Sequence, residues 1–372
     1  MDEATTKGTS TSTSTGTGTG TGVDTAVTGA DAATGARPLA AVLTEAAAAA
    51  GHAPSVHNTQ PWHWRVRPDS LELRAARDRQ LPATDPDRRL LILSCGAALH
   101  HARIALAAQG WTAQVQRLPD PAEEDLLAVL RPTERIAIQP DTVRMFQAMQ
   151  VRHTDRRPVS DEPLPVAAVT AITAAAGADV QLQILSSDQV VLLAAAASRA
   201  EEVESEDPQI RSELDYWTGL GTPPGTGLPD EVLPERAAQT TVPGRDFGRA
   251  GTLPVGGGHD RAAVYALLFG ADDEPASWLA AGEALSSAWL TATELGISVV
   301  PLSGAVEVAA TRQTLRHILA GLGYPYLVLR LGIASPDHAG PPHPPRMPAA
   351  QLVDTSAVDT AKPHAADPAE GR

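Results

Sequence analysis

The sequence predicts an α+β fold made of two related halves, each organised around one long helix. Two observations lead to this prediction. Predicted helices alternate with short strands along most of the chain, and the two longest helical patterns match each other at a constant spacing. The pairs that match at a separation of 186 residues (282 − 96) are Leu93/Leu279, Gly96/Gly282, Ala98/Ala284, Leu99/Leu285, Ala102/Ala288 and Gly110/Gly296.

The first half spans about residues 37–140. Apolar residues at helical spacing predict helices, short alternating segments predict strands, and glycine after the last periodic residue marks helix ends. In chain order we expect a helix at 38–50 ended by Gly51, strands at 63–67 and 70–75, a helix at 88–109 opened by Asp85 to Asp87, strands at 111–118 and 125–130, and a possible sheet extension at 133–138.

The second half spans about residues 141–335 and contains a segment, 205–258, in which glycine, proline and threonine interrupt every pattern. Loops this long are usually lids or disordered, so we expect a mobile, lid-like insertion carrying Tyr216 and Trp217. The remaining expected elements are helices at 141–150 with Asp141 as N-cap, 165–176, 188–204, 275–295 opened by Asp272 to Glu274, and 312–319, and strands at 180–185, 298–300 and 326–331.

The composition bounds the class of protein. Residues 1–36 are mostly Thr, Gly, Ser and Ala and are predicted to be disordered, and residues 336–372 form a Pro/Ala-rich tail tethered near Arg346. A net charge of −15 argues against nucleic acid or an anionic membrane as partner. A single cysteine fits a reducing compartment. No long apolar run and no secretory signal is seen, so we expect a cytoplasmic protein.

The stretch from Ala53 to Trp62, A-P-S-V-H-N-T-Q-P-W, carries the chemical signal. Serine and amide side chains supply both donors and acceptors after a helix, which suits a flat polar heterocycle. The pattern P-S-x-x-N-x-Q-P-W resembles the flavin-edge loop of the nitroreductase superfamily, and S-x-H-N-T-Q-P-W resembles its Acg-type branch. The resemblance covers about residues 37–353. The local alternative is a helix-exit turn whose polar residues satisfy nearby backbone.

The resemblance implies a nitroreductase-like fold that binds FMN. Nitroreductases are typically homodimers whose long central helices cross at the interface, and each flavin site takes residues from both subunits. This chain looks like such a dimer fused into two tandem halves. The residues that the resemblance assigns to FMN are Pro54, Ser55, Asn58 and Gln60 in the loop; Arg152, His153, Thr154 and Arg156, the nearest match to a phosphate-gripping Arg-Arg-Ser-x-Arg segment; Leu302, Ser303 and Gly304 near flavin N5; and Arg346 near the phosphate.

The two halves keep different parts of such a site. The first half has the polar loop but no Arg-x-Ser/Thr-x-Arg segment before its first helix. The second half has that segment, at 152–156, but its helix at 165–176 is followed by Gly177-Ala178-Asp179-Val180-Gln181 instead of the loop. We therefore expect one FMN site per chain, built across the interface between the halves, and no site at the mirror position.

The leading functional hypothesis is an FMN-dependent oxidoreductase that takes hydride from NAD(P)H and passes it to a small-molecule electron acceptor such as a nitroaromatic or quinone. No side chain need act as obligate acid or base, so no catalytic residue is assigned, and no metal site is expected. The alternatives are an FMN-binding or flavin-sequestering protein with a closed lid and little turnover, and a flavin-free scaffold. A monomer with pseudo-dimer architecture is expected.

Overall fold

Helices and strands are interspersed along the chain as far as residue 333. The structure is a computed structural model that describes residues 37–219, 221–335 and 340–359, and the predicted disordered segment 1–36 lies outside this part. The elements up to residue 135 are α1 (Leu39–Ala50), β1 (Trp62–Val66), β2 (Leu71–Ala75), α2 (Arg89–Ala108), β3 (Trp111–Arg117) and β4 (Leu126–Arg135). From residue 140 on they are α3 (Pro140–Val151), α4 (Val166–Ala175), β5 (Val180–Ile184), α5 (Ser187–Glu206), α6 (Pro208–Thr218), β6 (Val264–Gly270), α7 (Pro275–Glu294), β7 (Ile297–Leu302), α8 (Gly304–Glu307), α9 (Ala309–Ile318), β8 (Tyr324–Ile333), α10 (Ala349–Leu352), β9 (Val353–Asp354) and α11 (Ser356–Asp359).

The strands form two sheets with the same internal order. The first runs β3-β4-β2-β1-β9 and the second β7-β8-β6-β5. If β5 to β8 are taken as the counterparts of β1 to β4, the second sheet repeats the first strand for strand, and every shared pairing is antiparallel. An α+β fold with this repeated order is the arrangement that a tandem duplication predicts.

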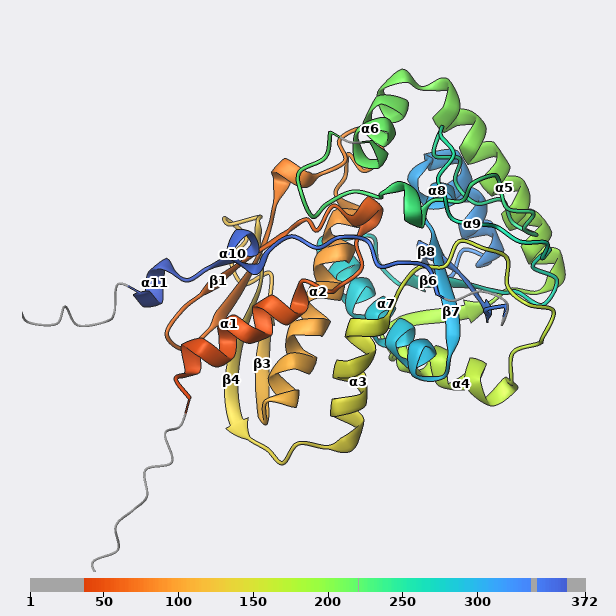
Figure 1. Ribbon diagram of the computed structural model, residues 1–372. Coiled ribbons are helices and arrows are strands. Elements are labelled where there is room, and N and C mark those ends of the chain that lie inside the picture. The colour runs from red at the N-terminus through yellow and green to blue at the C-terminus, as the bar shows by residue number, and fades with distance from the viewer. Residues whose placement is uncertain (1–36, 220, 336–339, 360–372) are drawn as a thin grey trace, which may run out of the picture. The chain divides into compact units, whose positions relative to one another are not determined.

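The two long helices α2 and α7 cross at a pair of glycines, between the two sheets in Figure 1. A Cβ built on Gly96 would lie 2.1 Å from the carbonyl oxygen of Leu279, and one on Gly282 would lie 1.9 Å from that of Leu93. Both neighbours are backbone atoms that cannot turn away, so only glycine permits this approach. The contact is reciprocal, since the two glycines and the two leucines are matched pairs in the sequence repeat.

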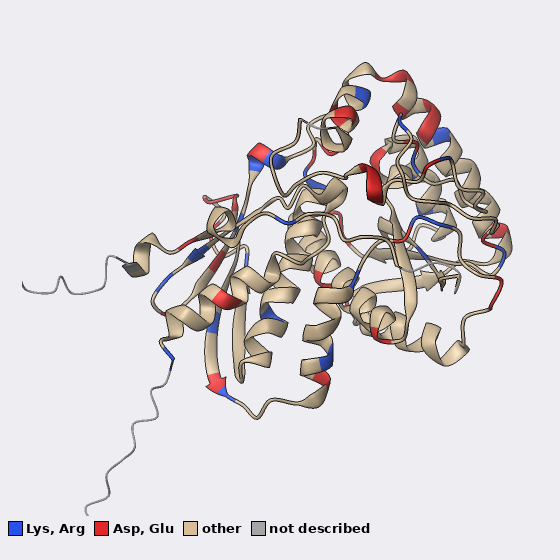
Figure 2. Cartoon of the chain, in the orientation of Figure 1, with Lys and Arg blue, Asp and Glu red and all other residues tan. Residues whose placement is uncertain are grey.

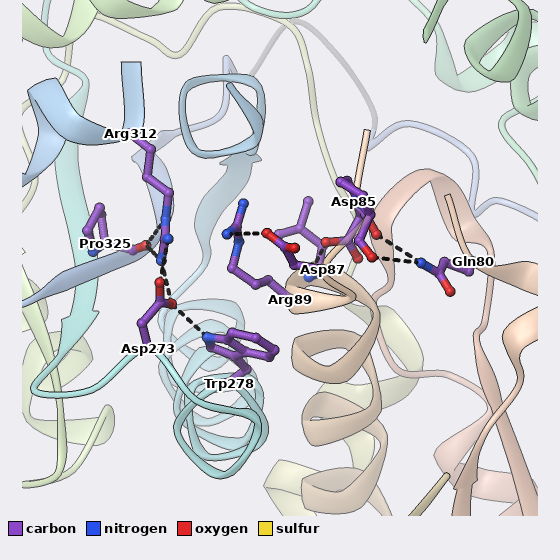
Figure 3. A network of polar contacts seen from close by, with 10 residues as sticks. Gln80, Asp85, Asp87, Arg89, Asp273, Trp278, Arg312 and Pro325 are labelled. Carbon is purple, nitrogen blue, oxygen red and sulfur yellow. Dashed lines mark hydrogen bonds and ion pairs between the residues drawn. The ribbon is translucent and has the colours of Figure 1, made fainter. Parts of the chain in front are cut away.

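The two acidic clusters before these helices play different roles, which Figure 3 shows together. The Asp85 carboxylate accepts hydrogen bonds from the backbone N–H groups of Leu90 (3.1 Å) and Leu91 (2.8 Å), so it caps α2 as expected. Asp273 instead pairs with Arg312 at 2.6 Å and accepts from the Trp278 indole at 2.8 Å. It ties α7 to α9 and caps no backbone group.

Several expectations for individual elements were wrong. The N-cap of α3 is Gln139 and not Asp141, which lies inside the helix and pairs with Arg144. The strand β6 was not expected, although its seven-residue run is almost wholly buried. The insertion contains the helix α6, capped by the Asp207 side chain. The insertion also has a small hydrophobic core of its own. This core brings together apolar residues that are scattered in the sequence: Leu214, Leu228, Val232, Leu233 and Phe247.

The C-terminal segment returns to the first half instead of trailing away. Strand β9 pairs in parallel with β1, through Trp64 and Val353, and Leu352 on α10 is buried. Figure 1 shows this segment in blue, passing from the end of β8 towards β1. Asn58 and Gln60 bind it on the way, so the segment around Arg346 is held beside the polar loop.

Helix α2 is the one element within the described residues with the length and mean hydropathy of a membrane span, which the sequence analysis had not anticipated. However, 83% of the qualifying window is buried inside the protein, as in a core helix. Cys95, at the middle of this helix, is fully buried, and burial raises the pKa of its thiol. The thiol is therefore a core group, as its apolar neighbours indicate.

Candidate functional site

A cavity of about 570 Å³ lies between the two halves and beneath the insertion. Its walls include segments far apart in the sequence: the loop after α1, the segment after α3, the end of β7 and the C-terminal segment. The predicted site residues that line it are Pro54, Ser55, Asn58, Arg152, Thr154, Arg156, Leu302, Ser303, Gly304 and Arg346, while Gln60 and His153 do not. Ser55 and Asn58 thus share one cavity with Thr154 and Arg156.

The polar loop holds a strained backbone. His57, Asn58 and Gln60 have positive φ values of 46°, 56° and 49°, a conformation that costs non-glycine residues free energy and clusters at functional sites. The Ser55 hydroxyl fixes the turn by accepting from the Gln60 backbone N–H at 2.9 Å. The loop also rests on α2, because the Ser94 hydroxyl accepts from the Val56 N–H at 3.3 Å.

The amides of Asn58 and Gln60 bind protein partners. The Asn58 amide nitrogen donates to the carbonyl oxygens of Gly227 (3.0 Å) and Pro345 (2.8 Å). The Gln60 amide nitrogen donates to Gly225 at 2.7 Å, and its oxygen accepts from the Met347 N–H at 3.0 Å. These two buried side chains therefore join the loop, the insertion and the C-terminal segment. They position the site and have little capacity left for a ligand.

Arg152 and Arg346 form a cationic end of the cavity. Both guanidinium groups donate to the carbonyl oxygen of His52, at 3.5 and 3.3 Å, and Arg152 stacks 4.4 Å from the ring centre of Trp289. Neither forms an ion pair with a carboxylate among the described residues. Burial, then the charge of Arg346, lowers the pKa of Arg152 to about 9, and burial lowers the pKa of Arg346 to about 10. A buried cation beside a half-buried one, neither with a carboxylate partner among the described residues, is an arrangement that favours a bound anion.

Arg156 belongs to a different part of the cavity. It donates to the carbonyl oxygen of Val232 at 3.2 Å and stacks 5.3 Å from the ring centre of Phe247, so its neighbours come from the insertion. Burial lowers its pKa to about 10. His153, by contrast, turns back to the carbonyl oxygen of Val151 at 3.0 Å. The residues of the predicted phosphate segment therefore have different neighbours: Arg152 lies beside Arg346, Arg156 contacts the insertion, and His153 contacts Val151.

The insertion contributes a buried charged group that the sequence did not reveal. Arg245 pairs with Glu204 at the end of α5 (3.3 Å) and with Glu307 on α8. One guanidinium faces two buried carboxylates, and burial together with the Glu307 charge raises the pKa of Glu204 to about 7. A Cβ on Gly304 would lie 3.5 Å from Arg245, so this cluster flanks the predicted flavin loop. Nothing in the Gly- and Pro-rich sequence around Arg245 marks it as buried.

The cationic end of the cavity contrasts with the acidic character of the chain as a whole. The chain has 44 acidic against 29 basic residues, and Figure 2 shows acidic residues along α5, which leads into the insertion, and along α6 within it. No cluster of three or more His, Cys, Asp or Glu suited to a metal ion occurs among the described residues. The cavity therefore combines two cations that lack carboxylate partners among the described residues with a strained polar loop in its wall, an arrangement typical of the class of proteins that bind phosphorylated ligands.

Comparisons with known proteins agree with this class. A Mycobacterium tuberculosis protein named "Putative NAD(P)H nitroreductase" is 40% identical over 313 residues, which cover 81% of this chain and 88% of that one. The M. tuberculosis protein named "Putative NAD(P)H nitroreductase acg" is 32% identical over 323 residues, covering 86% and 97%. The chain therefore belongs to the nitroreductase family, in agreement with the resemblance of its polar loop. No family model matches the chain.

Solved structures give looser alignments. A nitroreductase with bound FMN from Bacteroides fragilis aligns with 52% of this chain and 90% of its own, at 13% identity and a TM-score of 0.32. The FMN and NADPH-dependent nitroreductase NfnB of a sphigopyxis species aligns with 56% and 97%, at 17% identity and a TM-score of 0.35. At such TM-scores the alignments assign no residue of this chain.

Proposed function

We propose that this protein is an FMN-dependent oxidoreductase with one FMN site per chain, located in the cavity between the halves. The observation that carries the proposal is the pair of neighbouring guanidinium groups of the buried Arg152 and the half-buried Arg346, which lack carboxylate partners among the described residues. A phosphate monoester matches them in charge and in hydrogen-bond geometry. The family membership supplies the redox class.

The residues present fit FMN along the whole cavity. Arg152 and Arg346 would hold the phosphate, while Ser55 and the backbone at 302–304 would border the ring. Arg156 is available to a polar edge of the ring, where its charge would favour electron density on the reduced flavin. When bound, FMN would supply the hydride chemistry between NAD(P)H and a nitroaromatic or quinone-like acceptor. The protein binds, orients and excludes water, and we assign no catalytic acid or base.

The proposal is tested on purified protein under anaerobic conditions. Added FMN should bind, and NADH or NADPH should then bleach the absorbance of the bound oxidised flavin near 450 nm. A nitroaromatic or a quinone should restore that absorbance. Protein that binds FMN but is reduced by dithionite and by neither nicotinamide would contradict the oxidoreductase assignment while leaving FMN binding intact. Because one chain supplies both halves of the site, we also propose that the monomer is sufficient.

A second candidate function is flavin sequestration beneath a closed insertion. It is favoured by the number of bonds that hold the insertion down: Gly225 and Gly227 bind the polar loop, and the Glu213 carboxylate accepts from the backbone N–H groups of Ala83 (2.9 Å) and Thr84 (3.0 Å). Turnover that is absent in the wild type but gained when Glu213 is replaced would support sequestration. Turnover in the wild type would reject it.

A further inference from the structure

His57 is a cavity-lining residue to which neither the sequence analysis nor the proposed mechanism assigns a task. It lies at the centre of the polar loop, in the left-handed backbone conformation, and only 9% of the residue is exposed. Its ring meets that of Phe247 edge-on, with 6.3 Å between centroids. A strained, buried imidazole in a cavity wall is a group whose orientation the fold determines.

The insertion fixes which ring nitrogen of His57 carries the proton. Nη1 of Arg245 lies 3.5 Å from Nε2 of His57. A guanidinium has only donors, so the facing imidazole nitrogen has to be the acceptor, and the proton then resides on Nδ1. Arg245 cannot move away easily, because Glu204 and Glu307 hold it from the other side.

The Nδ1–H group is left for a ligand. No hydrogen bond joins Nδ1 to another described residue. Nδ1 also keeps some exposed surface, since it is absent from the fully buried polar atoms without a partner in the described part of the chain. Since His57 lines the cavity, this N–H can reach a molecule bound there. Burial, with the charges of Arg245 and Arg156, lowers the pKa of His57 well below its usual value, so the imidazole stays neutral. A neutral imidazole donates a directional hydrogen bond and adds no cation to the site.

We propose that His57, held in its Nδ1–H tautomer by Arg245, donates a hydrogen bond to a carbonyl or nitro oxygen of the acceptor bound over the flavin. The inference rests on the proposed function. It names the substrate class as oxygen-bearing acceptors and makes Arg245 a positioning residue. Under this assignment, closure of the insertion completes the site, because the group that sets the tautomer belongs to the insertion.

The tautomer is measured without any flavin. In protein labelled with ¹⁵N-histidine, the two ring-nitrogen shifts report which nitrogen carries the proton, and His57→Asn identifies the His57 signals by their loss. We expect the Nδ1–H form in the wild type and in Arg245→Lys, which keeps a donor-only cation. Arg245→Gln, whose amide can accept as well as donate, should populate both tautomers. A wild-type His57 in the Nε2–H form would overturn the inference and leave FMN binding untouched.

A matched pair of variants tests the contact with the acceptor. His57→Gly removes the side chain, and His57→Asn keeps an N–H donor; both residues tolerate positive φ. After reduction of the bound flavin with dithionite, reoxidation by 2-methyl-1,4-naphthoquinone should slow about tenfold in His57→Gly, as expected for one lost hydrogen bond. It should largely recover in His57→Asn, with FMN affinity changed less than about threefold in both. Equal reoxidation rates in the wild type and His57→Gly would overturn the inference, whereas failure of the wild type to bind FMN would instead overturn the proposed function.

Discussion

At the scale of single residues, the site is defined by charges that the protein leaves uncompensated. Most arginines among the described residues pair with carboxylates, as Arg312 does with Asp273 and Arg330 with Asp260. Arg152, which is buried, and Arg346, which is half-buried, have no such partners among the described residues, and burial without a partner lowers the pKa of both guanidinium groups. A bound anion would neutralise these charges, which is the role that the proposed FMN phosphate gives them.

Replacing Arg152 should separate FMN from riboflavin. The variant Arg152→Met keeps an apolar stem against Trp289 but loses the charge. We expect FMN affinity to fall about ten- to a hundredfold, since hydrogen bonds to charged groups contribute about 1.5–3 kcal/mol, and riboflavin affinity to stay unchanged. Fluorescence titrations with both ligands measure this. The exposed Arg199, replaced by Met, is the control, and an equal loss for riboflavin would show that Arg152 does not contact the phosphate.

The Glu204 carboxylate predicts a pH dependence of stability. Its pKa is raised to about 7 in the folded protein, from 4.5, so the folded state binds the extra proton between these values. Stability from this group is therefore present at low pH and is lost as the pH rises from about 4.5 to 7. The Glu204→Gln variant has no carboxylate to ionise there. Its free energy of unfolding should therefore rise relative to that of the wild type as the pH is raised from 5 to 8. Urea denaturation at both pH values measures the difference. A constant difference would mean that Glu204 is ionised throughout.

At the scale of elements, we propose that the insertion acts as a lid over the cavity. Its hydrogen bonds reach the polar loop and the turn at Ala83 and Thr84, and its Arg245 enters the cavity wall. Such bonds let a lid close in a single geometry. An element of this kind controls the rates of ligand entry and exit more than the chemistry itself.

Loosening the insertion at Glu213 should speed FMN binding. In Glu213→Ala the backbone N–H groups of Ala83 and Thr84 lose their acceptor, and the closed form loses about 1–3 kcal/mol. We expect faster FMN association in stopped-flow measurements and faster proteolysis within 205–258. Glu202→Ala, an exposed residue on the neighbouring α5, is the matched control. Unchanged association in Glu213→Ala would show that the insertion does not gate the cavity.

The helix crossing makes a further prediction about stability. In Gly96→Ala the new methyl group would overlap backbone atoms of α7, and the helices would have to separate. We expect a loss of at least about 1–3 kcal/mol in the free energy of unfolding, as for other overpacked cores. Gly257→Ala, where no atom lies within 4 Å of the new Cβ, is the control and should be close to neutral. Thermal or urea denaturation distinguishes the two. A neutral Gly96→Ala would contradict the close crossing.

The sequence predicted the elements whose signal is local. Long periodic helices with glycine ends, such as α2 and α7, were predicted to within about a residue at each end. Strand β6 was missed because a short apolar run carries no period, and α6 was missed because glycine and proline around it suggested a loop. Arg152 and Arg156 were singled out through their motif, and Arg346 through its resemblance to a C-terminal basic residue of the family. Arg245 was not, because its burial depends on Glu204 and Glu307, about 40 and 60 positions away.

At the scale of the whole molecule, the repeat explains why a single site is expected. The 186-residue separation places Arg103 at the position equivalent to Trp289 and Arg117 at that equivalent to Ser303 (289 − 103 and 303 − 117). Both arginines bind the Glu283 carboxylate, at 2.6 and 2.7 Å. These two arginines are thus already neutralised by a carboxylate, whereas Arg152 and Arg346 in the cavity have no carboxylate partner among the described residues. We infer that duplication was followed by loss of one site.

The number of FMN molecules bound per chain tests this account most directly. Purified protein saturated with FMN, freed of excess ligand and then denatured, releases flavin that absorbance quantifies against protein concentration. We predict one FMN per chain, and none in Arg152→Met/Arg346→Met under the same conditions. Two FMN per chain, or one FMN that survives this double replacement, would contradict the account.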